Sequence, residues 1–433
     1  MAQDNMQSNS IDRSSQPTRR EMVRGVLAVG AAAAVSTFPS FVHAAGSDVL
    51  KVGLIGCGGR GTGAANNALN ADPNIKLVAL GDMFPDKLET SLLGLRQSQH
   101  KDRVDISPEH QFTGWDAYKG VIETCDVVLL ATPPHFRPMH LKAVIEAGKH
   151  VFCEKPVATD APGLRSVIET AAKAKEKNLS LVSGLCYRYD DAKIETMKRI
   201  HDGALGDTIN LNVNYLTGGL WSNARKPEWS DMEWQLRNWL YFTWLSGDLI
   251  VEQHIHSIDK MMWMMKDETP AFALGNGGRA CRTQPAYGNV YDHFNTTYEW
   301  KNGVRCFASA RQWDGTANDV SDWMYGNKGS ANIMNHTITG ENAWKRKASP
   351  KNMYDLEHVA LFKSIRNNEP INNGDYMTKS TGAAIMGRMA AYTGLKVTWA
   401  QMMDSKENLA PAKYEMGPLE MTPIAVPGKT KIV

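Results

Sequence analysis

Short apolar runs alternate with helix-like segments over the first part of the chain. Each run has the length of a buried strand, and apolar positions between the runs recur at helical spacing. Strands that alternate with helices predict a parallel, doubly wound Rossmann sheet with helices on both faces. The five predicted strands are residues 50–56, 75–82, 126–134, 150–156 and 179–185.

Period-two alternation replaces this pattern after about Tyr187. In residues 208–216 every second position from Ile209 is apolar, and asparagines lie between the apolar positions. Such strands predict a second, α+β domain with a large, mostly antiparallel open sheet that is covered on one face. Further alternating strands are predicted at 289–300 and 303–313, and helices at 249–265 and 356–368.

The first 44 residues differ from the rest of the chain. The paired Arg19 and Arg20 precede a Gly/Ala-rich apolar run that is too short to span a membrane, and a small-residue cleavage site follows Ala44. This segment resembles a twin-arginine export signal, with an uncleaved anchor as the alternative. The predicted organisation is a signal at 1–44, a Rossmann domain at 45–186, a substrate-binding and oligomerisation domain at 187–407, and an extended tail at 408–433.

Composition narrows the class of protein. Of 433 residues, 42% are apolar and 22% charged, which excludes a disordered, fibrous or membrane protein, and a net charge of +2 gives no reason to expect a nucleic-acid partner. None of the six cysteines forms a CxxC pair, so a zinc ribbon is not expected and no metal is predicted. Cys281 and Cys306 could pair, although a free buried thiol is expected for each.

A glycine motif marks the end of the first strand. Gly56, Gly58 and Gly61 form G-x-G-x-x-G, whose backbone amides can approach a pyrophosphate at a helix N-terminus. Asp82 ends the next strand 21 positions after Gly61, where a carboxylate would bind the adenosine ribose. The alternative is a glycine-rich turn that binds no dinucleotide. Asp82 favours NAD over NADP, because a carboxylate repels a 2′-phosphate, while Arg60 and Lys87 leave NADP open.

A lysine stands at the exit of the strand that begins at His150. Pro156 biases Lys155 away from helical geometry, at the edge of the sheet where ligands bind in open α/β folds. The alternative is a surface lysine beside Glu154.

These motifs together resemble the Gfo/Idh/MocA family of oxidoreductases, named for glucose-fructose oxidoreductase and inositol dehydrogenase. The resemblance covers essentially the whole mature chain and rests on the glycine motif, residues 131–140, the triplet Glu154-Lys155-Pro156 and a later acid-x-x-x-His segment. It implies that Lys155 contacts the substrate hydroxyl and the nicotinamide end of the cofactor. The implied cofactor-binding residues are Gly56, Gly58, Gly59, Arg60, Gly61, Asp82, Thr132, Pro133, His140, Glu154 and Lys155.

The family's second catalytic element usually reads Asp-x-Gly-x-His. Here His256 takes the histidine position, Glu252 replaces the aspartate and His254 the glycine, which puts the role of Glu252 in doubt. Glu252, His256 and Asp259 stand at i, i+4 and i+7, so they would share one face of a helix. An imidazole suits removal of an alcohol proton, and a carboxylate can orient it. The alternatives are a structural histidine, or a metal site at Glu252, His254 and His256, whose histidines project to different faces.

Five tryptophans lie between residues 215 and 247. Aromatic rings cover the apolar faces of sugar or cyclitol rings, although core or subunit contacts are the alternative for each. The candidate substrate contacts are Tyr187, Arg188, Trp221, Arg237, Trp239 and His254.

The predicted reaction is hydride transfer between a ring hydroxyl of a sugar or cyclitol and NAD(H), with Lys155, His256 and Glu252 as catalytic residues. A periplasmic enzyme finds no free NAD, so we expect the cofactor to be tightly bound before export. Two other functions stay open: an NAD-dependent glycosidase or sugar lyase that acts through transient oxidation, and a non-catalytic sugar-binding protein. The expected partners are the substrate, the twin-arginine machinery transiently, and further copies of the chain in a dimer or tetramer.

Overall fold

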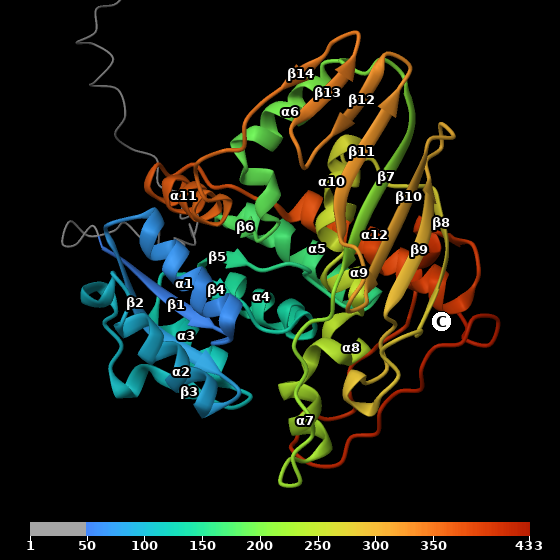
Figure 1. Ribbon diagram of the computed structural model, residues 1–433. Helices are drawn as coiled ribbons and strands as arrows, with labels where there is room; N and C mark the ends of the chain where they lie inside the picture. Colours follow the sequence, from blue (N-terminus) through green and yellow to red (C-terminus); the bar gives the residue numbers. More distant parts are fainter. Residues whose placement is uncertain (1–48) are drawn as a thin grey trace, which may run out of the picture. The chain divides into compact units, whose positions relative to one another are not determined.

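The computed structural model describes residues 49–433, and the predicted export signal lies outside them. The first sheet has six strands in the order β3-β2-β1-β4-β5-β6, and all neighbouring strands are parallel (Figure 1). This confirms the predicted Rossmann sheet. Its elements are β1 Leu50–Ile55, α1 Gly59–Ala71, β2 Ile75–Asp82, α2 Pro85–Arg96, β3 Gln111–Thr113, α3 Ala117–Thr124, β4 Val127–Leu130, α4 Arg137–Glu146, β5 His150–Cys153, α5 Ala161–Glu176 and β6 Leu181–Ser183.

The central strands of this sheet carry continuous apolar runs because helices cover both faces. All four residues of β4 are buried, as is typical of parallel strands. The last residues of β1, β4 and β5 are paired with one another, Ile55 with Leu130 and Leu130 with Cys153. These three strands therefore end side by side. The residues that follow them therefore emerge together at one edge of the sheet. Strand β3 was not predicted, because its three residues are too few and too exposed to form a pattern.

The second sheet has nine strands in the order β14-β13-β12-β11-β7-β10-β9-β8-β15. Only the pair β7 and β10 is parallel, so the predicted mostly antiparallel sheet is confirmed. Its strands are β7 Thr208–Thr217, β8 Phe272–Gly278, β9 His293–Glu299, β10 Arg305–Gln312, β11 Asp319–Gly326, β12 Gly329–Asn332, β13 Thr337–Gly340, β14 Trp344–Lys345 and β15 Val397–Thr398.

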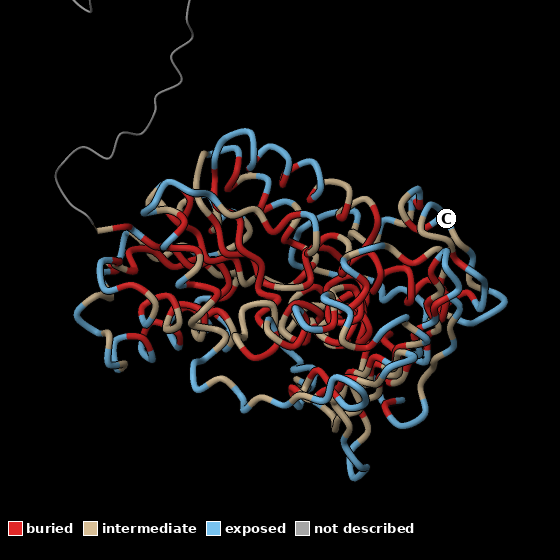
Figure 2. The backbone as a smooth tube through the Cα atoms, turned by 90° about the horizontal axis from the view of Figure 1, so that it is seen from above, coloured by how far each residue is buried: buried red, intermediate tan, exposed pale blue. Residues whose placement is uncertain are grey.

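Helices cover one face of the second sheet, and its other face is open (Figure 1). In Figure 2 the buried segments, drawn in red, run through the interior, and exposed turns, drawn in pale blue, lie around them. Cys306, Ala308 and Ala310 of β10 are buried, whereas Phe307 between them is 46% exposed. The remaining helices are α6 Asp191–His201, α7 Asp231–Arg237, α8 Thr243–Ser246, α9 Leu249–Glu252, α10 Ile255–Met264, α11 Met353–Arg366, α12 Gly374–Thr393 and α13 Trp399–Asp404. Short 3₁₀ helices occur at Lys101–Arg103, Pro108–His110, Pro134–Phe136, Cys186–Tyr189, Trp239–Tyr241 and Pro285–Tyr287.

The single helix predicted at 249–265 is wrong, because two helices, α9 and α10, occupy this segment. The backbone carbonyl of Glu252 accepts a hydrogen bond from Lys155 Nζ at 2.6 Å, and His256 N–H donates to the Gln253 carbonyl instead. A helix that continued through this point would need the Glu252 carbonyl for His256. The lysine from the first domain therefore takes the acceptor at the point where the helix breaks.

Residues 405–433 follow α13 without a further helix or strand. This tail runs past α7, where Met232 N–H donates to the Gly417 carbonyl and the Gln235 amide to the Leu419 carbonyl (Figure 1). Among residues 49–433, no helix combines the length and the apolar character needed to cross a bilayer.

Candidate functional site

The glycine loop between β1 and α1 combines tight packing with open space. Gly56 has φ of +98°, and a Cβ at Gly61 would lie 1.8 Å from the Gly56 carbonyl oxygen, so neither position accepts a side chain. A Cβ at Gly58 or Gly59 would meet nothing within 4 Å. The backbone at these two residues therefore faces free space at the start of a helix, which suits a pyrophosphate.

A cavity of about 570 Å³ opens over this loop, within the usual size range of a ligand site. Nine of the predicted cofactor residues line it: Gly56, Gly58, Gly59, Arg60, Gly61, Asp82, Thr132, Pro133 and His140. Further residues that line the cavity were not predicted, among them Phe84, Trp115, Tyr118 and Asn223. Phe84 lies two positions after Asp82, the last residue of β2, and this short distance was the available signal. The cavity and the open glycines fit a dinucleotide.

Asp82 is fixed at the carboxyl end of β2. Its two carboxylate oxygens accept hydrogen bonds from the backbone N–H groups of Cys57, at 2.6 Å, and Phe84, at 2.9 Å. Burial raises the pKa of Asp82, which these hydrogen bonds partly oppose. The carboxylate thus connects the glycine loop to the residues that follow β2.

Arg60 and Glu154 pair with each other across the site. Arg60 Nε lies 2.8 Å from Glu154 Oε1, and the guanidinium also stacks over the Tyr354 ring. Glu154 is buried and accepts the backbone N–H of Lys155 at 3.1 Å. Glu154 and Lys155 lie outside the cavity lining, so their predicted contacts with the cofactor stay predictions.

Lys155 reaches from the first domain into the second. Its Nζ donates to Glu252 Oε1 at 2.9 Å as well as to the Glu252 carbonyl, and both side chains are largely buried. Two of the three ammonium donors are thereby used, and one is left for another acceptor. Glu252 thus holds Lys155 rather than His256, which differs from the arrangement that the helical spacing predicts.

His256 lies close to this lysine. Burial lowers the pKa of His256 well below its usual value, and the charges of Lys155 and Lys260 lower it further. The ring packs edge-on against Tyr187 at 5.4 Å, and its Nδ1 has no hydrogen-bond partner among the described residues. A neutral imidazole with a free nitrogen has the form required of a proton acceptor.

A buried ion pair that was not predicted lies near His256. Lys260 Nζ lies 3.0 Å from Asp322 Oδ2, and neither side chain is exposed. Lys260 also lies 3.9 Å from the centre of the Tyr187 ring. Asp322 shares the inner face of β11 with the buried Met324, so a charged residue in an apolar register was the signal.

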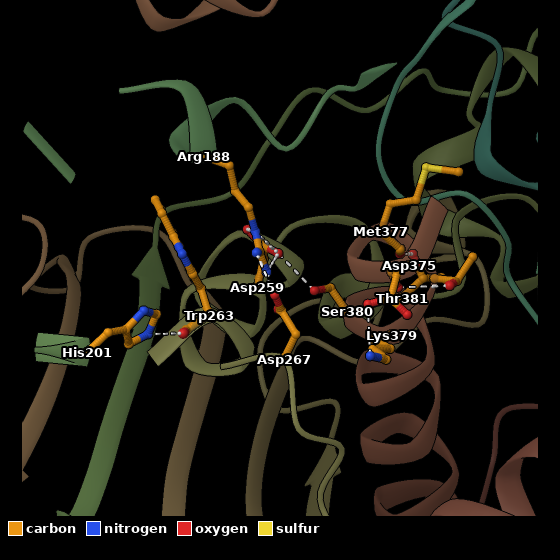
Figure 3. Close-up of polar contacts among 11 residues, drawn as sticks. Arg188, His201, Asp259, Trp263, Asp267, Asp375, Met377, Lys379, Ser380 and Thr381 are labelled. Carbon is orange, nitrogen blue, oxygen red and sulfur yellow. Dashed lines mark hydrogen bonds and ion pairs between the residues drawn. The ribbon is translucent and has the colours of Figure 1, made fainter. Parts of the chain in front are cut away.

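Arg188 and Asp259 belong to a different cluster (Figure 3). Arg188 lies between two carboxylates, at 2.9 Å from Asp259 and 2.6 Å from Asp267, and Ser380 donates to Asp259 at 2.8 Å. Asp259 is therefore occupied with Arg188 rather than with His256. A substrate contact for Arg188 stays a prediction, because its guanidinium is already paired at both carboxylates.

The remaining candidate substrate residues are divided between two places. Trp221, Arg237 and Trp239 line the dinucleotide cavity rather than the surroundings of His256, whereas Tyr187 contacts His256. His254 is fully buried, and burial lowers its pKa to about 3.

Within residues 49–433, no three His, Cys, Asp or Glu side chains are placed to hold a metal ion, so the alternative metal site has no support. All six cysteines, which lie in the described part, are free, and Cys281 is exposed rather than buried as expected.

Residues 50–181 match the model of the GFO_IDH_MocA oxidoreductase family, NAD-binding Rossmann fold. This part of the chain is therefore similar to the NAD-binding domain of that family. The matched segment contains the glycine loop, Asp82 and Lys155, but not His256.

Known proteins resemble larger parts of the chain. A glycosyl hydrolase family 109 protein of Shewanella pealeana is 26% identical over 59% of this chain and 54% of its own length. Inositol 2-dehydrogenase 4 of Saccharopolyspora erythraea is 28% identical over 52% of this chain and 56% of its own. The chain thus spans about half the length of these curated relatives.

Among solved structures, an aldose-aldose oxidoreductase of Caulobacter crescentus, complexed with glycerol, superposes with a TM-score of 0.62. The superposition covers 81% of this chain and 99% of that chain at 20% identity. The two chains therefore share a fold over both sheets.

Proposed function

We propose that this chain is an exported oxidoreductase that transfers hydride between a ring hydroxyl of a sugar or cyclitol and a tightly bound NAD(H). The observation that carries the proposal is that Lys155, at the exit of β5, bonds to Glu252 at the end of α9, and that its charge lowers the pKa of His256, at the edge of the sheet that holds the glycine loop. Similarity to an inositol dehydrogenase supports the substrate class.

The residues take distinct parts in this chemistry. The nicotinamide supplies the hydride acceptor or donor. His256 removes the hydroxyl proton, for which its low pKa keeps the imidazole neutral. Lys155 donates its third N–H to the developing alkoxide, and Glu252 fixes the lysine in position.

Two features favour NAD over NADP. The Asp82 carboxylate at the ribose position would repel a 2′-phosphate. Arg60, the nearest cation in the glycine motif, is paired with Glu154. Tight binding is required in the periplasm, where no free NAD is available. Nucleotide that remains with the purified protein and is released on denaturation would support this, and full dependence on added NAD would contradict it.

The decisive test of the activity uses the cofactor-loaded protein. We expect a member of a panel of sugars and cyclitols to change the nicotinamide absorbance at a rate that depends on Lys155 and His256. Binding of a sugar without any turnover, unaffected in the Lys155→Ala and His256→Ala variants, would favour a non-catalytic binding protein.

A second candidate is an NAD-dependent glycosidase, which the similarity to a family 109 glycosyl hydrolase favours. In that case oxidation of a ring hydroxyl would be transient, and the nucleotide would end unchanged. Net release of an aglycone from a glycoside panel, without accumulation of reduced nucleotide, would select this function.

Export through the twin-arginine machinery is part of the proposal. Replacement of Arg19 and Arg20 by lysine should retain the protein in the cytoplasm, and cell fractionation measures this. Unchanged periplasmic recovery would contradict the predicted signal.

The open face of the second sheet supports a homo-oligomer. Leu274, Phe307 and Tyr325 are between 37% and 50% exposed on strands β8, β10 and β11, and the strand register places them on this open face. A second copy would bury such apolar side chains. Sedimentation velocity should show a dimer or tetramer that Phe307→Lys converts to monomer.

A further inference from the structure

One wall of the dinucleotide cavity comes from the second domain. We call residues 221–239 the cap segment, because it supplies Trp221, Asn223, Leu236, Arg237 and Trp239 to a lining that otherwise belongs to the Rossmann domain. The segment is internally braced: Asn223 donates its side-chain amide to the Arg237 carbonyl, and its backbone N–H to the Asn238 side chain. The cap segment is therefore a structured part of the nucleotide site.

Arg237 attaches the cap segment to the residues that follow Asp82. Its two terminal nitrogens donate to the two carboxylate oxygens of Asp86, at 3.0 and 3.1 Å, and its Nε donates to Glu233 at 2.8 Å. The guanidinium carbon lies 3.8 Å from the centre of the Phe84 ring. A bidentate pair on an aromatic face is among the stronger contacts that an arginine makes at a partly exposed site.

The pKa of Asp86 agrees with an ion pair between Arg237 and Asp86. The hydrogen bond from Arg237 lowers the pKa of Asp86, which therefore stays ionised at neutral pH. Phe84 and Arg237 both line the cavity, so the contact lies at its rim rather than on a distant surface.

The tail fixes the cap segment from outside. Gly417 and Leu419 accept hydrogen bonds from Met232 and Gln235, and Leu419 N–H donates to Asp231. Nearby in the tail, Tyr414 packs on Trp115 of the Rossmann domain at 5.7 Å, and Trp115 lines the same cavity. The cap segment is thereby held between the Rossmann domain and the tail.

We propose that Arg237, through Asp86 and Phe84, fastens the cap segment over the adenosine end of the cavity and limits the rate at which the bound dinucleotide leaves. This inference rests on the proposed function, because it assumes that the cavity holds a dinucleotide. It assigns Arg237 to cofactor retention rather than to the substrate contact that the sequence suggested. A cofactor held in this way stays with a folded chain when no free NAD surrounds it.

The test measures the dissociation rate of the nucleotide from the whole protein. Protein loaded with NADH is mixed with excess NAD, and the decay of nicotinamide fluorescence gives the rate. We expect Arg237→Ala to accelerate release on the order of tenfold, since both the ion pair and the aromatic contact are lost. Asp86→Asn should accelerate it less, because the contacts with Phe84 and Glu233 remain.

Arg199→Ala is the matched control. Arg199 of α6 pairs with Glu195 at 3.1 Å and lies over the Trp344 ring, is 43% exposed, and does not line the cavity. Its loss should leave the release rate unchanged. Thermal unfolding shows whether each variant is folded, and Asp86→Asn keeps the test valid if Arg237→Ala does not fold.

The outcomes separate this inference from the proposed function. Release at the wild-type rate from folded Arg237→Ala and Asp86→Asn would overturn the inference and leave the proposed function in place. Failure of the wild type to bind NADH would defeat both. Accelerated release from a protein that turns over no sugar would support the inference and count against the proposed activity.

Discussion

The two ends of the proposed active site are built in different ways. At the nucleotide end, backbone from one continuous segment, Gly56 to Gly61, faces a cavity of about 570 Å³. At the hydride end, Lys155 and Glu252 come from different domains, are largely buried, and already bond to each other at 2.9 Å. The first end presents space for a ligand, and the second presents charge.

This difference has a physical reason. A pyrophosphate is bound by backbone amides at a helix N-terminus, so this end of the site needs a tight turn and residues without side chains. A developing alkoxide requires a donor and a proton acceptor held within hydrogen-bond reach, and only packing of two domains can hold them. Substitutions at the two ends should therefore affect different steps.

The largest effect is expected at Lys155. Lys155→Met removes the donor to the alkoxide and should lower kcat on the order of 10³-fold, with little change in nucleotide affinity. Stopped-flow absorbance with the active sugar measures the hydride step. Lys142→Met, at a side chain that is 53% exposed on the surface, is the control. If Lys155→Met weakened nucleotide binding as much as it lowered kcat, the two ends of the site would not affect different steps.

Gly59→Ala should weaken NAD binding and have little effect on the hydride step. Its Cβ meets no protein atom within 4 Å, so the fold should be kept, but the methyl group enters the space for the pyrophosphate. We expect the Kd for NAD to rise roughly 10- to 100-fold, as judged from the loss of one or two backbone contacts. Titration calorimetry measures this, and Gly94→Ala, which also meets no atom within 4 Å, is the control.

Glu252→Gln tests whether this carboxylate positions the lysine. The amide keeps an acceptor for Lys155 but loses the charge, so kcat should fall about tenfold while KM changes little. Recovery in Glu252→Asp would indicate that charge rather than length is required. A rise in KM with unchanged kcat would instead place Glu252 in substrate binding.

A further effect, which does not concern turnover, is expected on stability at mildly acid pH. Burial lowers the pKa of His140, at the nucleotide end, and of His254, near the hydride end, to about 3 each. Their unfolded pKa is about 6.5, so below pH 6.5 only the unfolded chain binds these protons, and stability falls as pH falls. Each contributes roughly 1.4 kcal/mol per pH unit between about pH 6 and 4.

Urea unfolding of His140→Asn and His254→Asn at a series of pH values measures these contributions. In each variant, the slope of the free energy of unfolding against pH should decrease by the amount that corresponds to about one bound proton. An unchanged slope in either variant would show that its histidine is not buried in the neutral form.

The glycine loop and the strand-end residues of the nucleotide end follow from local sequence, whereas the pairing at the hydride end does not. The glycine spacing, Asp82 and residues 131–140 predicted nine lining residues, because these lie close in sequence to strand ends that are paired in register. At the hydride end the helical spacing of Glu252 and His256 predicted a pair that the structure replaces with Glu252 and Lys155. The break between α9 and α10 depends on a bond from a residue 97 positions away.

The aromatic segment shows the same limit. Its tryptophans indicate a ring-binding surface, but nothing within residues 215–247 indicates which ring or which domain they face. Arg237 contacts Phe84 and Asp86 only because α7 is held against the Rossmann domain by the tail. That packing joins segments on either side of the chain's midpoint.

The sequence by itself determined the Rossmann sheet, the dinucleotide loop, the alternating second sheet and the identity of Lys155 and His256 as candidates, because each follows from local periodicity or from a short motif. Tertiary structure alone decided that Glu252 holds Lys155, that Lys260 and Asp322 lie beside His256, and that Arg237 belongs to the nucleotide cavity. Ion pairs between distant segments depend on how domains pack, and no spacing along a chain encodes that geometry.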